Sequence, residues 1–265
     1  TTEIYTLSLH DALPICGDNV ADLANWANSQ GSLFGTDTGA ALTEIVGDRI
    51  PTVASRFDRE LTGKLGDLPE DAAELSVYED WKTGKLSSRV ASQFWSIAKP
   101  KAKYRCLDIG CGISFLIYPW LEWGAFFHGQ DVSGVACDIL KSRAPQLNSK
   151  LFKSITKAPA HLLEYEPIFD MAIATGFSCY YPLDYWAMVM QAVRKVLKPG
   201  GVFVFDAIDT ETELADDWAL LEMYLGLEVE LESAATWKKF LKDAGVTKTK
   251  RKDSELFALY RVSWD

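Results

Sequence analysis

The sequence predicts an α/β fold built on a doubly wound, mostly parallel sheet of seven strands, and three observations support this. From residue 103 onward, short apolar runs alternate with helical patterns, which is typical of a parallel sheet covered by helices. The run Arg105–Ile109 ends directly in Gly110-Cys111-Gly112, where a strand must turn sharply toward a helix. A second apolar run ends in Asp131, whose carboxylate could accept both hydroxyls of a ribose. Together these features predict a nucleotide-binding half of such a sheet.

The predicted elements follow one another in regular order. Strands are expected at 103–109, 125–130, 151–154, 169–174 and 201–207, followed by an antiparallel pair at 247–252 and 256–264. Helices are expected at 114–122, 133–143, 159–164, 185–197 and 234–244. Ser133 is the expected N-cap of the second helix, and Lys198-Pro199-Gly200-Gly201 is expected to end the fourth.

The first residues are expected not to belong to the natural protein. The stretch Tyr5–Ile15 resembles the in-frame translation of a short-read sequencing adapter, as in chains assembled from metagenomic reads. It has neither the basic start nor the long apolar core of a signal peptide. Residues 1–15 are therefore predicted to have no part in fold or function.

Residues 16–100 are predicted to form a helical lid over the ligand-binding edge of the sheet. The strongest pattern is in residues 41–65, where apolar residues recur at intervals of three and four around Pro51. Further helices are expected near Glu70 and at 87–98. The sheet domain is then expected to cover residues 101–265.

Composition argues against several classes of protein. The hydrophobic share of 48% suits a packed core, and no run approaches the roughly 20 apolar residues of a membrane span. A net charge of −10 disfavours a nucleic-acid partner, so the basic stretch Lys248–Lys252 is expected to be a solvated edge. The five cysteines show no metal-ligand spacing, which predicts reduced thiols in a cytoplasmic protein without a metal or disulfides. Neither a membrane nor a nucleic acid is expected as a partner.

Four segments in order resemble the class I methyltransferases that use S-adenosylmethionine. They are Leu107–Gly112, Gly129–Ser133, Ile168–Ala174 and Val193–Phe205. In the last, a helix ends in Leu197-Lys198-Pro199-Gly200-Gly201 before an apolar strand, which is a fairly specific signature of the family. The resemblance covers Tyr104 to Trp264. It implies a Rossmann-like sheet with an antiparallel final strand, and S-adenosylmethionine as cofactor.

The resemblance also implies roles for individual residues. Asp108 would orient the ammonium of the cofactor directly or through water, Asp131 would hold the ribose hydroxyls, and Val132 would pack on the adenine. Cys111 is expected to be a small filler in the glycine turn. The implied cofactor-binding residues are Asp108, Gly110, Cys111, Gly112, Asp131, Val132, Thr175, Gly176 and Phe177.

The sequence departs from the family pattern after the third strand. Family members usually have an acid there that contacts the adenine amino group, whereas Thr156–His161 contains no acid. The adenine is then expected to be held by backbone groups or by His161. His161 is also a candidate catalytic base, although a histidine at the surface or at a helix cap is the competing interpretation.

The segment after the fourth strand restricts the acceptor. The Asn-Pro-Pro-Tyr type motif of amide and base methylation is replaced by Gly176–Pro182. Ala174-Thr175 stands where metal-dependent catechol enzymes carry an acid, so no metal is expected despite Asp206 and Asp209. Aromatic residues gather near the expected mouth of the site, although half or more of them could belong to the core. They are Phe177, Tyr180, Tyr181, Tyr185, Trp186, Trp218 and Tyr224.

These features predict methyl transfer to an O or N atom of a small apolar or aromatic molecule, or of an amine. Tyr180 or Tyr181 is hypothesised to orient the nucleophile, so the catalytic candidates are Tyr180, Tyr181 and His161. The insertion 209–232, with apolar residues on a helical face, is expected to cap the site. Two alternatives remain: a non-catalytic cofactor-binding relative and a nicotinamide-dependent oxidoreductase. The latter is disfavoured because Phe115 replaces the third glycine of a dinucleotide loop.

Overall fold

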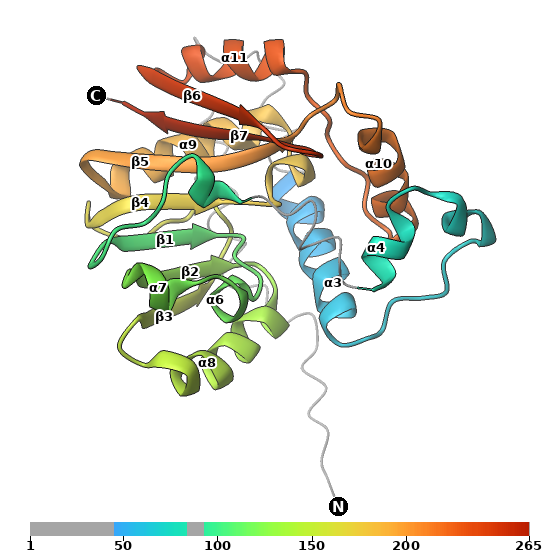
Figure 1. Ribbon diagram of the computed structural model, residues 1–265, viewed down its shortest axis with the longest axis horizontal. Helices are drawn as coiled ribbons and strands as arrows, with labels where there is room; N and C mark the ends of the chain where they lie inside the picture. Colours follow the sequence, from blue (N-terminus) through green and yellow to red (C-terminus); the bar gives the residue numbers. More distant parts are fainter. Residues whose placement is uncertain (1–44, 84–92, 265) are drawn as a thin grey trace, which may run out of the picture. The chain divides into compact units, whose positions relative to one another are not determined.

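The computed structural model describes residues 45–83 and 93–264 of the 265-residue chain (Figure 1). The chain divides into two compact units, Thr1–Thr52 and Val53–Asp265. In the first unit, Ile45–Arg49 forms a π-helical turn (η2), and the Thr52 hydroxyl donates to the Asp48 carbonyl at 2.7 Å. The adapter-like segment and most of the predicted helix 87–98 lie outside the described residues.

The second unit is built on a seven-stranded sheet in the order β3-β2-β1-β4-β5-β7-β6, which can be followed from bottom to top in Figure 1. Strands β3, β2, β1, β4 and β5 pair in parallel, whereas β7 is antiparallel to both of its neighbours. The predicted doubly wound sheet with an antiparallel final strand is therefore confirmed. The strands are β1 (Arg105–Ile109), β2 (Phe126–Asp131), β3 (Phe152–Lys157), β4 (Phe169–Ala174), β5 (Leu197–Ile208), β6 (Lys248–Asp253) and β7 (Phe257–Ser263).

The burial of each strand follows its sequence. β4 and β5 are central and read as nearly continuous apolar runs, as expected for strands covered on both faces. β6 is one of the two edge strands, and every one of its residues is exposed. Its charged side chains keep an open edge from pairing with other chains, and the expected solvated edge at Lys248–Lys252 is confirmed.

Helices α8 (Gly134–Asn148), α9 (Leu183–Val196) and α11 (Ala234–Asp243) lie where the sequence predicts them. Ser133 caps α8 as expected, because its hydroxyl oxygen accepts the Ala136 N–H at 2.9 Å. The expected helix 114–122 is instead two single turns, α6 (Ser114–Ile117) and α7 (Trp120–Trp123), because Pro119 cannot continue the helical hydrogen bonds.

One predicted helix is absent, and one predicted strand begins earlier than expected. The chain over 159–164 forms a loop and not a helix, because the Gln130 side-chain amide binds the carbonyls of Pro159 and Leu162 at 2.7 and 2.9 Å. β5 begins at Leu197 and not at residue 201, because α9 ends at Val196 and Leu197 already pairs with Phe169.

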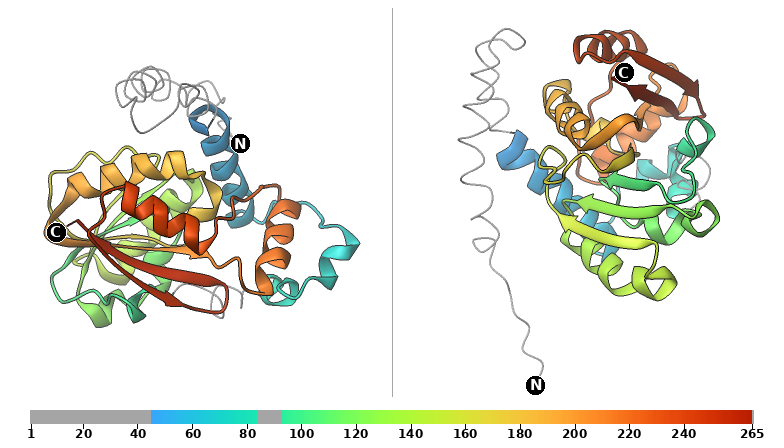
Figure 2. Two further views of the ribbon diagram at one scale, coloured as in Figure 1. Left: turned by 90° about the horizontal axis from the view of Figure 1, so that it is seen from above. Right: turned by 90° about the vertical axis from the view of Figure 1, so that its left-hand side faces the viewer.

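The remaining helical segments gather at the carboxyl ends of the parallel strands, toward which the arrowheads point in Figure 1. Figure 2 shows α4 and α10 side by side from a second direction. The Ser76 N–H donates to Asp217 at 2.8 Å, and the Tyr224 hydroxyl donates to Asp71 at 2.8 Å. These segments are α3 (Ile50–Leu61, with Pro51 in its first turn), η3 (Glu70–Glu74), α4 (Tyr78–Lys82) and α10 (Leu214–Tyr224). The turn η4 (Phe94–Ser96) precedes β1, and its Phe94 ring packs against the Trp123 ring.

Candidate active site

The glycine turn after β1 exposes backbone where a ligand can approach closely. Gly110 and Gly112 have φ of 62° and 50°, a region that side-chain-bearing residues rarely adopt. The Gly110 N–H donates to the Gln130 carbonyl at 2.8 Å, which fixes the turn against β2. A Cβ on Gly110 would lie 2.7 Å from the Phe177 ring, whereas a Cβ on Gly112 would meet no atom within 4 Å. Gly110 is therefore required for packing, and Gly112 faces open space.

Asp131 ends β2 with a carboxylate that is held rigidly. Its Oδ2 accepts the Gly112 N–H and its Oδ1 accepts the Ser133 N–H, both at 2.7 Å. Burial raises the pKa of Asp131 above its ordinary value, while the two N–H donors oppose this shift. Because an ionised carboxylate has about four lone-pair sites, both oxygens can still accept hydroxyl groups.

Asp108 is buried beneath the glycine turn. Its Oδ2 accepts the Ser114 hydroxyl at 2.5 Å, and its side chain is almost inaccessible. Burial raises the pKa of Asp108 to about 7, against the lowering effect of the Ser114 hydrogen bond. A cationic group nearby would shift this carboxyl toward its charged form.

The loop after β4 is held by a residue whose role the sequence analysis missed. The Gly176 N–H donates to both Asp206 carboxylate oxygens, at 2.8 and 3.0 Å. Asp206 is completely buried on β5. The Thr175 hydroxyl lies 2.9 Å from the Tyr118 hydroxyl. Asp206 thus positions the predicted site residue Gly176, and Tyr118 positions Thr175.

A cavity of about 330 Å³ joins these elements, within the usual range for ligand pockets. It brings together most of the predicted site residues, but its lining does not include Asp108 or His161. The predicted site residues that line the cavity are Gly110, Cys111, Gly112, Asp131, Val132, Thr175, Gly176, Phe177, Tyr180 and Tyr181.

Helix α3 supplies wall residues that the sequence analysis did not assign to the site. Val53, Phe57 and Leu61 line the cavity from positions spaced by four, a spacing that predicted the helix but not its role. Glu60 also lines it. Asp58 fixes α3 to the start of α8, since its Oδ1 accepts the Ser133 hydroxyl at 2.5 Å and the Val135 N–H at 3.1 Å.

The predicted aromatic cluster divides into wall and core. Phe177, Tyr180 and Tyr181 line the cavity, and the Tyr180 ring contacts the Phe57 ring edge to face at 5.4 Å. The others do not line it: Tyr185 and Trp186 are fully buried in the core, the Trp218 ring lies 6.5 Å from the Tyr180 ring, and the Tyr224 hydroxyl donates to Asp71.

His161 lies outside the cavity wall. Its Nδ1 is 3.0 Å from the Tyr185 hydroxyl, and burial lowers the pKa of His161 to about 4. Its Nε2 has no hydrogen-bond partner in the part of the chain that the structure describes. The catalytic role of His161 stays a prediction, and Tyr185 is the partner that the structure gives its ring.

Other charged groups near the site are engaged in structural contacts. Asp209 pairs with Arg251 at 3.0 Å.

Over residues 45–83 and 93–264, no three His, Cys, Asp or Glu side chains are arranged to hold a metal ion. In the same ranges, no helix is both long and apolar enough to cross a bilayer.

Comparisons with known proteins agree with this geometry. Residues 107–203 match a family model described as a methyltransferase domain. A sterol 4-C-methyltransferase of Caenorhabditis elegans is 33% identical over 194 residues, which are 71% of this chain and 55% of the relative, so the chain spans about half of that protein.

Solved structures share the fold. Magnesium protoporphyrin IX methyltransferase from Synechocystis PCC 6803, with bound S-adenosylhomocysteine, has a TM-score of 0.52 at 15% identity and covers 81% of this chain and 99% of its own. Geranyl diphosphate C-methyltransferase from Streptomyces coelicolor A3(2) has a TM-score of 0.56 at 12% identity. The match covers 82% of this chain and 98% of that protein's chain. Residues 107–203 of the chain thus match the methyltransferase-domain family model, and the chain shares the fold of these solved methyltransferases.

Proposed function

We propose that this chain transfers the methyl group of S-adenosylmethionine to an O or N atom of a small apolar or aromatic molecule. The observation that carries the proposal is one cavity with two kinds of lining. The cofactor-side wall (Gly110, Gly112, Asp131, Val132 and Gly176) presents bare backbone and a fixed carboxylate. The acceptor-side wall (Phe57, Glu60, Leu61, Tyr180 and Tyr181) is mainly aromatic and apolar.

The residues of the cofactor-side wall fit S-adenosylmethionine. Gly112 and Gly176 both have positive φ, and a Cβ on either would meet open space, so a ligand can approach the backbone there. Asp131 would accept the ribose hydroxyls, and Val132 would pack on the adenine. Ala158 and Ala160 also line the cavity while His161 does not, which favours backbone groups over His161 as partners of the adenine.

When bound, S-adenosylmethionine supplies an electrophilic methyl group on a positively charged sulfur. In-line displacement of this kind depends mainly on alignment and on exclusion of water. Phe177, which packs against Gly110 and contacts Tyr181 at 5.0 Å, would hold the reacting groups in line between the two walls. Tyr180 and Tyr181 would orient the acceptor.

The charge of the lining restricts the acceptor. The described residues around the cavity include two acids, Glu60 and Asp131, but no Lys, Arg or His. A phosphate or carboxylate on the acceptor would lose its hydration without gaining an opposite charge. A neutral molecule or an amine, which aromatic faces bind well, suits this lining.

Two other functions are candidates: methyl transfer to a carbon atom, and oxidation or reduction with a nicotinamide cofactor. The C. elegans relative is named as a sterol 4-C-methyltransferase, which makes a carbon atom of an extended apolar molecule the second candidate acceptor. The nicotinamide alternative is disfavoured because Phe115 occupies the position of the third glycine, and its buried ring packs 5.2 Å from the Phe127 ring.

The test is incubation with methyl-labelled S-adenosylmethionine and a panel of phenols, aliphatic amines and sterols, with products located by mass spectrometry and NMR. Labelled O- or N-methyl products are expected. A product labelled only at carbon would replace the proposal with the second candidate. Tight binding of S-adenosylhomocysteine without any product would favour a non-catalytic relative.

A further inference from the structure

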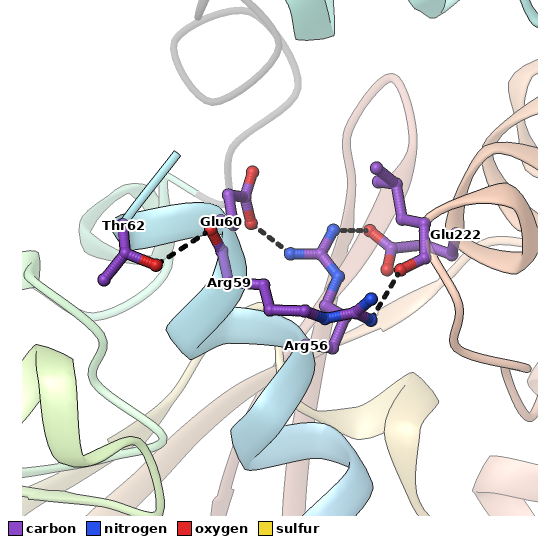
Figure 3. Close-up of polar contacts among 6 residues, drawn as sticks. Arg56, Arg59, Glu60, Thr62 and Glu222 are labelled. Atoms are coloured by element: carbon purple, nitrogen blue, oxygen red, sulfur yellow. Dashed lines mark hydrogen bonds and ion pairs between the residues drawn. The ribbon is translucent and has the colours of Figure 1, made fainter. Parts of the chain in front are cut away.

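A network of charged side chains lies beside the cavity, includes Glu60 of the acceptor-side wall, and joins α3 to α10 (Figure 3). Arg56 binds Glu222 through Nη2 and Oε1 at 3.0 Å, and its Nη1 pairs with Glu60. Arg59 adds a hydrogen bond to the Leu225 carbonyl at 3.4 Å. The side chains of Arg56 and Glu222 are only 2% and 8% exposed, so this pair has lost most of its hydration.

Packing alone does not explain this network. Removing charged groups from water costs several kcal/mol per ion, and apolar residues of similar size often give equal or greater stability. Within the described residues, Arg56 pairs with both glutamates, whereas Arg59 binds a backbone carbonyl. Among the described residues, Arg56 Nε and Glu222 Oε2 have no hydrogen-bond partner. Such an arrangement suggests a role in which Glu222 changes its protonation.

The network reaches the cavity through Tyr180. The Tyr180 hydroxyl is hydrogen-bonded to the Glu222 carboxyl, while Tyr180 itself lines the cavity. The Phe57 ring contacts the Tyr180 ring edge to face. The Arg56 guanidinium lies 4.5 Å from the centre of the same Phe57 ring. Tyr180 therefore connects the acceptor space to a buried carboxyl.

We propose that Tyr180 and Glu222 form a proton relay for an acceptor that carries an O–H or N–H group, an inference that rests on the proposed methyl transfer. The acceptor lone pair forms the bond to the methyl carbon, and the carbon–sulfur bond breaks with its electron pair staying on sulfur. The acceptor proton moves to the Tyr180 oxygen, and the Tyr180 proton moves to the Glu222 carboxylate. Tyr180 is the catalytic residue, and Glu222 acts through it as a positioning residue.

The surroundings of Glu222 support this role. The charged and titratable groups that face it are Arg56 and Glu60 from α3, and Cys179 and Tyr180 from η5 (Ser178–Tyr180). Burial raises the pKa of Glu222 to about 7, against the opposing charge of Arg56. Burial and Glu222 also raise the pKa of Tyr180 well above its ordinary value, so Tyr180 stays a phenol.

A proton acceptor works best when its pKa lies near the operating pH. Glu222 is a carboxylate above a pH of about 7 and a neutral acid below it. The relay therefore predicts that kcat/KM falls about tenfold per pH unit as the pH decreases below 7, and reaches a plateau above it.

The experiment measures kcat/KM for an acceptor identified in the labelled panel, from pH 5.5 to 9, with S-adenosylmethionine saturating at every pH. Glu222→Gln should lower kcat by about 100-fold or more and remove the acidic limb. Tyr180→Phe should behave alike, and the double variant should lose no more than either single variant. Affinity for S-adenosylhomocysteine should stay within twofold of wild type. The control is Asp217→Asn, which removes another contact of α10 and should keep both kcat and the pH profile.

A wild-type kcat and acidic limb in Glu222→Gln would overturn the relay. So would a loss in Glu222→Gln that is matched by weaker S-adenosylhomocysteine binding, because that result indicates structural support only. If wild type fails to bind S-adenosylhomocysteine, methyl transfer itself is wrong. If wild type turns over and Glu222→Gln is unaffected, only the relay is wrong.

A second measurement covers the case in which Glu222→Gln does not fold. The wild-type protein is labelled with ¹³Cζ-tyrosine and bound to S-adenosylhomocysteine, and the Tyr180 signal is assigned by its loss in Tyr180→Phe. The relay predicts a shift of this signal with a midpoint near pH 7. A signal that does not change between pH 5.5 and 9 would overturn the inference.

Discussion

The two walls of the cavity differ in how they are built. The cofactor-side wall comes from the ends of β1, β2 and β4, where glycines and acids follow short apolar strands. The acceptor-side wall and the network beside it join residues that are far apart in the chain, such as Arg56 and Glu222, which are 166 residues apart. One wall is therefore specified locally, and the other depends on the packing of α3 against α10.

The largest expected effect tests this dependence. Arg56→Met should lower the free energy of unfolding by about 3–5 kcal/mol, because it leaves Glu222 buried without its cation. The loss of unfolding free energy in Arg56→Met should be larger at pH 8 than at pH 5. The folded-state pKa of Glu222 is raised to about 7, so its ionisation weakens the folded state as the pH rises from the unfolded value of 4.5. Denaturant unfolding at both pH values measures this.

A double variant serves as the control for Arg56→Met. Arg56→Met with Glu222→Leu replaces both partners by apolar side chains and should recover much of the lost stability. If the double variant is as unstable as Arg56→Met alone, the buried charge is not the cause of the loss.

The second effect concerns the cofactor-side wall. Gly110→Ala should cost about 1–3 kcal/mol, because alanine at a φ of 62° is strained and its Cβ would lie 2.7 Å from Phe177. Affinity for S-adenosylhomocysteine should fall at least tenfold. Gly66→Ala is the matched control, since a Cβ there meets no atom within 4 Å and its φ is ordinary. Equal behaviour of both variants would contradict the role of Gly110.

The contrast between the walls also shows what sequence could predict. The sheet, the glycine turn and Asp131 were predictable because each signal lies within a few residues of the element that it describes. The site contacts of Phe57, Glu60 and Glu222 were not predictable, because helical periodicity shows that a face is buried but not which surface covers it.

The errors near β3 have the same origin. The loop over 159–164 looked helical, but Gln130 on a neighbouring strand binds two of its carbonyls. The ring of His161, the histidine in that loop, pairs with Tyr185, a contact that sequence spacing does not reveal. Hydrogen bonds between distant segments thus override local preference in this part of the site.

The third effect is a pH dependence of ligand binding. Burial raises the pKa of Asp108 to about 7, and the ammonium of S-adenosylhomocysteine would favour the carboxylate. Affinity should therefore fall as the pH decreases below 7, by up to about tenfold per unit, with protons released on binding. Titration calorimetry in buffers of different ionisation enthalpy measures this. An Asp108→Asn variant with the same pH dependence as wild type would exclude Asp108.

The smallest effect is expected at the outer contact of α10. Asp217→Asn should change the free energy of unfolding by less than about 1 kcal/mol, because its hydrogen bond from the Ser76 N–H is exposed to solvent. Thermal unfolding measures this. A loss as large as that of Arg56→Met would mean that this outer contact, and not the buried network, holds α10 in place.

The most direct test of the central claim is the affinity of S-adenosylhomocysteine for wild type, Asp131→Ala and Tyr180→Phe, measured by titration calorimetry. Asp131 ends β2 and faces the cavity with both oxygens fixed, whereas Tyr180 belongs to the acceptor-side wall. We expect binding to wild type, a loss of affinity of at least 100-fold in Asp131→Ala, and wild-type affinity in Tyr180→Phe. Undetectable binding to wild type, or unchanged binding to Asp131→Ala, would contradict the central claim.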